Sequence, residues 1–220
     1  SANIYDIVVS GNYAYLASSD NSRELDVINI SNPAVPIRAG SLNLAGSQDS
    51  YALAINGSSL YLGRASSSAE FNVISVAVPS VPVLIGTYNY DNSILDLAVS
   101  GTNVFIASSS DSQEFSVIDV TTSTLPSLTS ALDLSGNADA NSLALDGSSV
   151  IIGRTSSSSD ELNLLDISTV STPILLGSAD VASSVYGTAF QNSSYVFLAT
   201  DATSNQWQRW SIAEPSLIAR

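Results

Sequence analysis

The chain has 220 residues, of which 45% are apolar and 12% are charged, and its formal net charge is −14. This composition favours a folded domain with a sizeable core over a disordered chain, and no apolar run reaches the length of a membrane helix. The sequence has no Cys, His or Met, and all six basic residues are Arg, which excludes disulfides, most zinc, copper and iron sites, and Ser-His or Cys-His nucleophile pairs.

The first 44 residues predict four short strands in succession. Residues 5–9 and 14–18 flank the turn Ser-Gly-Asn at 10–12, which suits a tight hairpin that needs positive φ. Residues 24–30 and 36–44 follow as two further strands. No part of the chain shows a helical period with capping residues, so we expect an all-β fold.

The same pattern returns four more times. The residue at the first turn recurs at steps of 46, 44, 46 and 45 residues, at Gly11, Gly57, Gly101, Gly147 and Asn192. A second landmark keeps the same phase to within one residue, at Glu24, Glu70, Glu114, Glu161 and Gln206. Four strands in about 45 residues are typical of a propeller blade.

We therefore predict a single domain that is a five-bladed β-propeller, with about 45 residues and four antiparallel strands in each blade. The strand at 216–220 would be the outermost strand of the last blade. The predicted blades lie approximately at 1–46, 47–91, 92–137, 138–182 and 183–220.

A finer pattern pairs the copies. Copies two and four end their second strand with Gly-Arg, at 63–64 and 153–154, and continue into serine tracts, whereas copies one and three end it with Ala-Ser. This alternation indicates a duplicated two-blade unit with a divergent fifth blade. In that fifth blade Trp207 and Trp210 point to opposite faces of a predicted strand. One would lie in the core, and the other would cover an edge or an interface, or make an assembly contact.

The predicted third strands of the first four copies share a short apolar motif. The motif reads LDVIN at 25–29, FNVIS at 71–75, FSVID at 115–119 and LNLLD at 162–166. These segments and their surroundings resemble the LVIVD repeat, a family found in bacterial and archaeal surface and secreted proteins whose members look like β-propellers. The fifth copy departs from the motif, with WQRWS at 207–211. The resemblance implies the fold and an extracellular setting, and it implies no catalytic residues.

Propeller geometry would place the second-to-third and fourth-to-first connections on one face, which is rich in carboxylates. A rigid scaffold that presents loops is a common ligand-binding arrangement, and calcium prefers carboxylate and carbonyl oxygens. No loop matches a calcium-binding motif, so calcium stays an alternative and no metal site is assigned. The candidate ligand-binding acids are Asp20, Asp49, Asp91, Asp111, Asp139 and Asp160, with Asp201 on the same face.

Arg64 and Arg154 are further candidates for ligand binding, because each precedes a serine tract that ends at Glu70 or Glu161. One interpretation is an exposed cross-strand ion pair that contributes about 0–1 kcal/mol. The other is an arginine that binds a carboxylate of a ligand through two hydrogen bonds.

Asp6 and Asp96 lie five residues before the turn glycines of copies one and three. The innermost strand would carry both into a central channel, where they would bind an ion or water. Paired carboxylates can also hydrolyse glycosides, but the equivalent residues of the other copies are Ala52, Ser142 and Gly187. The sequence therefore disfavours a hydrolase.

These observations predict a non-enzymatic β-propeller module without a cofactor, located outside the cell or at its surface. The absence of Met suggests a processed chain whose signal peptide or anchor has been removed. Its role would be structural, adhesive or in filament or pilus-type assembly, with a protein, a glycan or further copies as partners. The alternative is a propeller that binds calcium or a basic partner through its acidic loops. Nucleic acid is excluded by the lack of clustered Lys and Arg, and membrane insertion by this segment is not expected.

Overall fold

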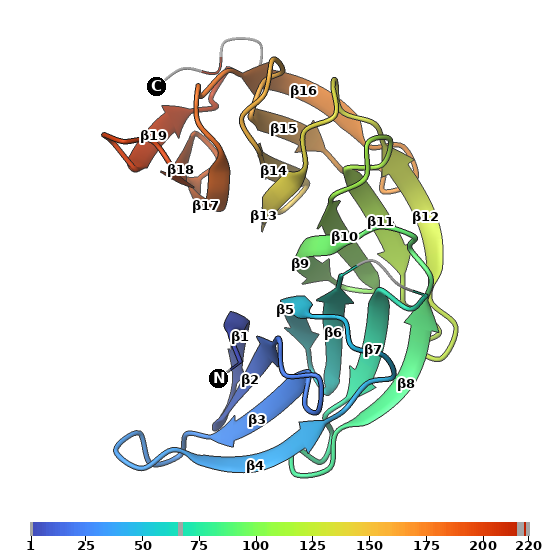
Figure 1. The fold of residues 1–220 in the computed structure, drawn as a ribbon. Coiled ribbons are helices and arrows are strands. Elements are labelled where there is room, and N and C mark those ends of the chain that lie inside the picture. Colours follow the sequence, from blue (N-terminus) through green and yellow to red (C-terminus); the bar gives the residue numbers. More distant parts are fainter. Residues whose placement is uncertain (1, 66–67, 215–217, 219–220) are drawn as a thin grey trace. The chain divides into compact units, whose positions relative to one another are not determined.

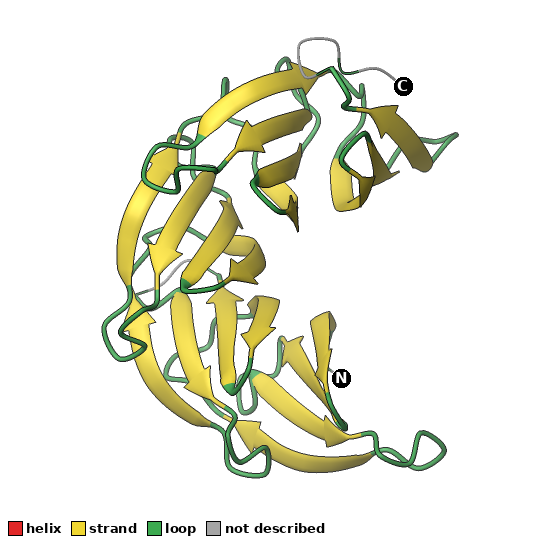
Figure 2. Ribbon diagram, turned by 180° about the vertical axis from the view of Figure 1, so that it is seen from behind, coloured by secondary structure: helices red, strands yellow, loops and turns green. Residues whose placement is uncertain are grey.

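The structure is a computed structural model that describes residues 2–65, 68–214 and 218. The described residues form 19 strands joined by turns and loops, without a helix (Figure 2). None of them therefore belongs to a helix able to cross a membrane. The prediction of an all-β fold is confirmed.

The strands form five sheets in which neighbours along the chain are also neighbours in the sheet (Figure 1). The first sheet contains β1 (Ile4–Ser10), β2 (Tyr13–Ser18), β3 (Leu25–Asn29) and β4 (Ile37–Leu42). The second contains β5 (Ser50–Asn56), β6 (Ser59–Arg64), β7 (Phe71–Ser75) and β8 (Val83–Tyr88). The third contains β9 (Ile94–Ser100), β10 (Asn103–Ser108), β11 (Phe115–Asp119) and β12 (Ser127–Leu132).

The fourth and fifth sheets lie in the last part of the chain. The fourth contains β13 (Ala140–Asp146), β14 (Ser149–Arg154), β15 (Leu162–Asp166) and β16 (Ile174–Ala179). The fifth contains β17 (Val185–Asn192), β18 (Tyr195–Thr200) and β19 (Trp207–Ser211). The strand predicted at 216–220 falls on residues that, apart from Ile218, lie outside the described part of the chain.

The first turn of each sheet is a two-residue hairpin turn. Ser10 pairs with Tyr13, and the equivalent pairs of the second, fourth and fifth sheets are likewise three residues apart. Only the backbone of glycine reaches left-handed φ without a steric cost, and the four turn glycines have φ between 57° and 60°. The predicted hairpins are thus confirmed. In the fifth sheet the predicted turn residue Asn192 instead ends β17 and pairs with Tyr195, so Ser193 and Ser194 form the turn.

The second sequence landmark marks the loop between the second and third strands. In every sheet the backbone N–H at the end of the second strand donates to the carbonyl of the landmark residue. The donor and acceptor pairs are Ser18 and Glu24, Arg64 and Glu70, Ser108 and Glu114, Arg154 and Glu161, and Thr200 and Gln206. The serine-rich segments are therefore loops whose two ends are joined by a backbone hydrogen bond. Residues 66 and 67 lie outside the described part of the chain.

The chain divides into two compact units, of which the first comprises residues 1–104 and 119–127 and the second residues 105–118 and 128–220. Within each unit one sheet packs face to face on the next. The face that a sheet turns to the following sheet is here called its forward face, and the opposite one its rear face.

In the first unit, Tyr15, Leu25 and Val27 of the first sheet's forward face join Leu62 and Ile74 of the second sheet's rear face in a buried cluster. In the second unit, Ile151, Leu162 and Leu164 of the fourth sheet pack in the same way on the fifth sheet, with Trp210 and Leu198. Trp210 is buried and Trp207 is exposed, as the spacing of the two residues predicts.

Candidate functional site

The Gly-Arg pairs of the second and fourth sheets are built into the core. A Cβ atom on Gly63 would clash with the side chain of Ile94, and one on Gly153 would lie 2.5 Å from Cγ1 of Val185. Both partners lie at the start of the following sheet's first strand. Glycine therefore leaves room for a β-branched side chain of the next sheet.

Arg154 is 1% exposed and is held by the loop that precedes its own sheet. Its guanidinium donates to the carbonyl oxygens of Ser135 at 2.9 Å, Ala138 at 3.2 Å and Gly136 at 3.3 Å. Its Nη2 also lies 3.5 Å from Oε1 of Glu114, which is fully buried. Burial lowers the pKa of Arg154, and the charge of Glu114 opposes this effect.

Arg64 repeats the arrangement in the first unit. It is 1% exposed and donates to the carbonyl oxygen of Ala45 at 3.1 Å and to Oε1 of Gln48 at 3.4 Å. Burial lowers its pKa, and the charges of Glu24 and Glu70 oppose the shift, with Glu24 contributing the larger part. Both arginines thus bind the loop between two sheets and lie near the glutamate of the preceding sheet.

These contacts correct the predicted exposed ion pair. The Arg154 side chain pairs with Glu114 of the preceding sheet, 40 residues away, instead of with Glu161 across its own hairpin. Only the backbones of Arg154 and Glu161 bond across that hairpin. Because a β-strand alternates its side chains between two faces, Arg154 points to the buried rear face of its sheet. Neither arginine is available to clamp a ligand.

The four landmark glutamates share a second role that the sequence did not reveal. Each is at most 1% exposed, and each accepts a backbone N–H from the residue 20 positions later, at 2.8–3.0 Å. The donors are Leu44, Tyr90, Leu134 and Val181, which lie in the loops after the fourth strands. The constant separation of a glutamate from an apolar residue is the signal that could have indicated these bonds.

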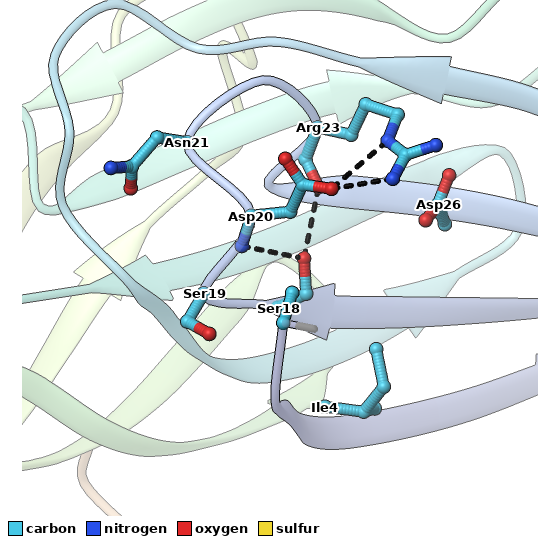
Figure 3. Close-up of a pocket in the computed structure, with 8 residues that line it drawn as sticks. Ile4, Ser18, Ser19, Asp20, Asn21, Arg23 and Asp26 are labelled. Carbon is cyan, nitrogen blue, oxygen red and sulfur yellow. Dashed lines mark hydrogen bonds and ion pairs between the residues drawn. The ribbon is translucent and has the colours of Figure 1, made fainter.

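The candidate acids of the first unit accept hydrogen bonds from other side chains of that unit. Figure 3 shows Asp20 turned towards Arg23, with the Ser18 hydroxyl between the two ends of the loop. Hydrogen bonds from Ser22 and Arg23 lower the pKa of Asp20. Asp49 accepts from the Tyr5 hydroxyl at 3.2 Å. Asp91 accepts from the Asn89 amide at 2.7 Å.

In the second unit, Asp160 accepts from the Ser178 hydroxyl at 2.5 Å, and the exposed Asp201 donates its backbone N–H to Ser184. Burial raises the pKa of Asp139, and the nearby charge of Asp111 raises it further. Among the candidate acids of this unit, Asp111 and Asp139 thus interact electrostatically. Nowhere in the described part of the chain do three acidic side chains form a group that could hold a metal ion.

Asp6 is half-buried, and its contacts are those of a structural residue. Its Oδ2 accepts a hydrogen bond from the backbone N–H of Leu53 at 2.6 Å, and this bond joins β1 to β5. Its Oδ1 accepts a hydrogen bond from the backbone N–H of the next residue, Ile7, at 2.7 Å. Asp96 accepts the N–H of Leu97 at 2.8 Å. Burial raises the pKa of Asp6, and the two hydrogen bonds partly offset the rise.

Three open hollows lined by described residues bear on the candidate site. One of about 560 Å³ includes Ile4, Asp20, Arg23 and Asp26 (Figure 3), on the rear side of the first sheet. Another of about 390 Å³ lies among Ser156, Ser183 and Asp201 and neighbouring loop residues. A third of about 240 Å³ lies on the forward face of the fifth sheet and is mostly apolar.

Five successive meander sheets with repeated loop closures define the chain as a β-propeller repeat fold, and solved structures agree. A chain of the Mitotic Checkpoint Complex matches all of this chain and 64% of its own length, with 14% identity and a TM-score of 0.78. The computationally designed Ika8 protein matches 97% of this chain and 59% of its own length, with 15% identity and a TM-score of 0.72. The chain thus spans less than two thirds of these two proteins.

The β-propeller domain of Myceliophteria thermophila Cps50 (Swd1) gives a TM-score of 0.70 at 12% identity, covering 94% of this chain and 68% of that one. The family model of the LVIVD repeat matches residues 3–43, which form the first repeat of this fold. The predicted resemblance is thereby confirmed for the first sheet. A comparison with curated proteins gives no significant match.

Proposed function

We propose that this chain is a non-enzymatic, five-bladed β-propeller module that works outside the cell as a structural or adhesive part of a surface assembly. The observation that carries the proposal is that the chain uses buried charged side chains to hold its own loops. Arg64, Arg154 and the four landmark glutamates are buried and bound to backbone groups. A scaffold that uses its ionic groups to fix loops is suited to presenting surfaces.

The LVIVD repeat at residues 3–43 supports the extracellular setting, because that family occurs in surface and secreted proteins. The solved structures share only the fold at this level of identity, so the surface role is our inference. The net charge of −14 favours solubility and mutual repulsion of free copies. Assembly would then require specific apolar surfaces.

The surface role is tested with intact cells of the source organism. An antibody against the chain should label cells that have not been permeabilised, and protease added outside should remove that signal. A cytoplasmic marker serves as the control for intact cells. Labelling that appears only after permeabilisation would overturn the extracellular assignment.

A second candidate is cation binding at the acidic loops, favoured by the electrostatic interaction of Asp111 with Asp139. The charge of Asp111 raises the pKa of Asp139, and a bound cation would relieve this repulsion. Calorimetry with calcium chloride tests this candidate, with Asp111→Asn as the matched variant. Heat uptake that persists unchanged in the variant would place any binding elsewhere.

A further inference from the structure

The rear face of the first sheet has the side chains of an inter-sheet interface but is open in its own unit. Ile4, Ile7 and Val9 of β1 are 50%, 55% and 59% exposed. Their equivalents in β5 are Ser50, Leu53 and Ile55, of which the first two are at most 3% exposed. Leu53 and Ile55 pack in the cluster that joins the second sheet to the first. Within its unit, the first sheet therefore presents an uncovered interface.

The forward face of the fifth sheet is uncovered in the second unit. Trp207 is 65% exposed and stacks on Phe197 with ring centroids 4.7 Å apart. The same pair of positions holds Tyr61 and Phe71 in the second sheet, stacked at 6.1 Å and at most 4% exposed. The apolar hollow of about 240 Å³ lies beside Trp207 on this face.

One uncovered face is a forward face and the other is a rear face. Wherever two sheets meet within a unit, a forward face packs on a rear face, so the two uncovered faces are of the types that pack together. They are also complementary in charge. Arg209 stands on the forward face where the other sheets have Val27, Val73, Val117 and Leu164. Asp26 stands on the rear face where the others have Asn72, Ser116, Asn163 and Gln208.

Both charged residues have partners within their own sheets. Arg38 Nε lies 2.9 Å from Asp26 Oδ1, and Arg209 lies over the Tyr195 ring at 4.6 Å from its centroid. The Arg38 side chain is 47% exposed and that of Asp26 is 12% exposed, so water reaches the arginine and screens that pair in part. Covering the face would exclude this water and strengthen any attraction of Arg209 to Asp26.

We propose that the fifth sheet of one copy docks its forward face, with Trp207 and Phe197, on the rear face of the first sheet of a second copy. This inference rests on the proposed assembly role and names its surfaces. The contact continues the interface that successive sheets already form, with Trp207 taking the place of Phe71. Such a contact joins two different surfaces, so copies add head to tail into a ring or a filament.

The test uses the whole chain and three single variants. Ile7→Asp alters only the first-sheet surface, and Trp207→Asp alters only the fifth-sheet surface. The matched control is Leu125→Asp, because Leu125 is 75% exposed and lies outside both faces. Light scattering after size-exclusion chromatography measures the mass between about 1 and 100 μM, a range in which weak specific interfaces associate. Circular dichroism verifies that each variant is folded.

The proposal expects the wild type and Leu125→Asp to associate as concentration rises, and Ile7→Asp and Trp207→Asp each to remain monomeric. An equimolar mixture of the latter two should form a dimer and stop there, since each supplies the face that the other lacks. No interface between identical surfaces gives this result.

Three results would overturn the proposal. The first is a wild type that stays monomeric at 100 μM. This holds even if hydrogen exchange then shows that the β1 amides are protected within a single chain. The second is association that survives both aspartate variants, and the third is a mixture that remains monomeric. Failure here leaves the surface role standing, because cell labelling tests that role independently.

Discussion

Arg64 and Arg154 are the largest side chains that the described chain buries almost completely. An arginine suits this place because its planar guanidinium carries five donors that can reach several carbonyl oxygens at once and is more weakly hydrated than an ammonium group. Removing one partner of a buried ion pair leaves the other charge without compensation. The role of each arginine therefore appears in stability and not in binding.

Replacing Arg154 by Met should lower the free energy of unfolding by about 3–5 kcal/mol, because Glu114 is left buried without its cation. A double-mutant cycle with Glu114→Gln should give a coupling energy of about 1–3 kcal/mol. Urea denaturation of the four proteins measures it. The pair Arg38 and Asp26, in which the arginine side chain is 47% exposed, is the control. Tested as Arg38→Met and Asp26→Asn, it should couple more weakly than the buried pair, by about 1 kcal/mol. Equal coupling in both pairs would contradict the assigned burial.

Gly153→Ala should lower the free energy of unfolding by about 1–3 kcal/mol, because the added methyl group overpacks the contact with Val185. The matched positions of the third sheet and its neighbour are Ala107 and Ala140, so two small residues also satisfy this contact. The double variant Gly153→Ala, Val185→Ala should therefore lose less than the two single losses added together. Thermal and urea unfolding measure the three variants, and strict additivity would show that the two residues do not press on each other.

At the scale of strands and loops, one carboxylate fixes each connection to the following sheet. Glu161 accepts the N–H groups of Val181 at 2.8 Å and Ala182 at 3.2 Å. Glu161→Ala should free the amide of Val181, while the amide of Ala182 keeps its hydrogen bond to Oδ1 of Asp180 at 2.7 Å. Hydrogen exchange at the Val181 amide should rise about tenfold in the alanine variant, equivalent to ~1.4 kcal/mol, and less in Glu161→Gln, which keeps an acceptor oxygen. Unchanged exchange in the alanine variant would mean that the loop is held by other contacts.

Asp6 joins the inner strands of the first two sheets, and its ionisation should make stability depend on pH. Burial raises its pKa from the ordinary 3.8, so the folded chain binds this proton more tightly than the unfolded chain. Below pH 3.8 Asp6 is protonated in both states, so its ionisation does not lower the stability. As the pH rises through the raised pKa, Asp6 ionises in the folded chain and the free energy of unfolding falls.

The variant Asp6→Asn lacks this loss, yet its amide oxygen can still accept the N–H of Leu53. Its stability relative to the wild type should therefore increase as the pH rises above 3.8 and stay level once Asp6 is ionised in the folded wild type. Urea unfolding at several pH values measures the difference. A difference that is constant with pH would show that Asp6 ionises equally easily in both states.

Periodicity was sufficient to predict the strands and the two repeated turns, because hairpin glycines and loop closures depend on neighbouring residues. The burial of Arg154 and its pairing with Glu114 were not predictable in this way. They depend on which sheet face carries the arginine and on a partner 40 residues away in another sheet. The acidic loops look like a binding face in the sequence, but contacts such as Asp20 with Arg23 and Asp49 with Tyr5 are visible only in three dimensions.

At the scale of the whole molecule, a repeat fold gains stability from contacts between neighbouring units, and its terminal repeats need a cover or a polar outer face. Ile7 on the first sheet and Trp207 on the fifth are apolar and exposed within their own units. The chain thus has the surfaces for association, while its net charge of −14 opposes it.

The proposed association should therefore respond to salt. Each copy carries a net charge of −14, and long-range repulsion between copies is screened when the Debye length falls from about 30 Å at 0.01 M to about 8 Å at 0.15 M salt. The attraction between Arg209 and Asp26 acts at short range across a desolvated face and is screened less. Raising sodium chloride over this interval should tighten association several-fold in sedimentation experiments. If salt weakened it instead, charge attraction would dominate the contact, and Arg209→Gln should then abolish the salt dependence.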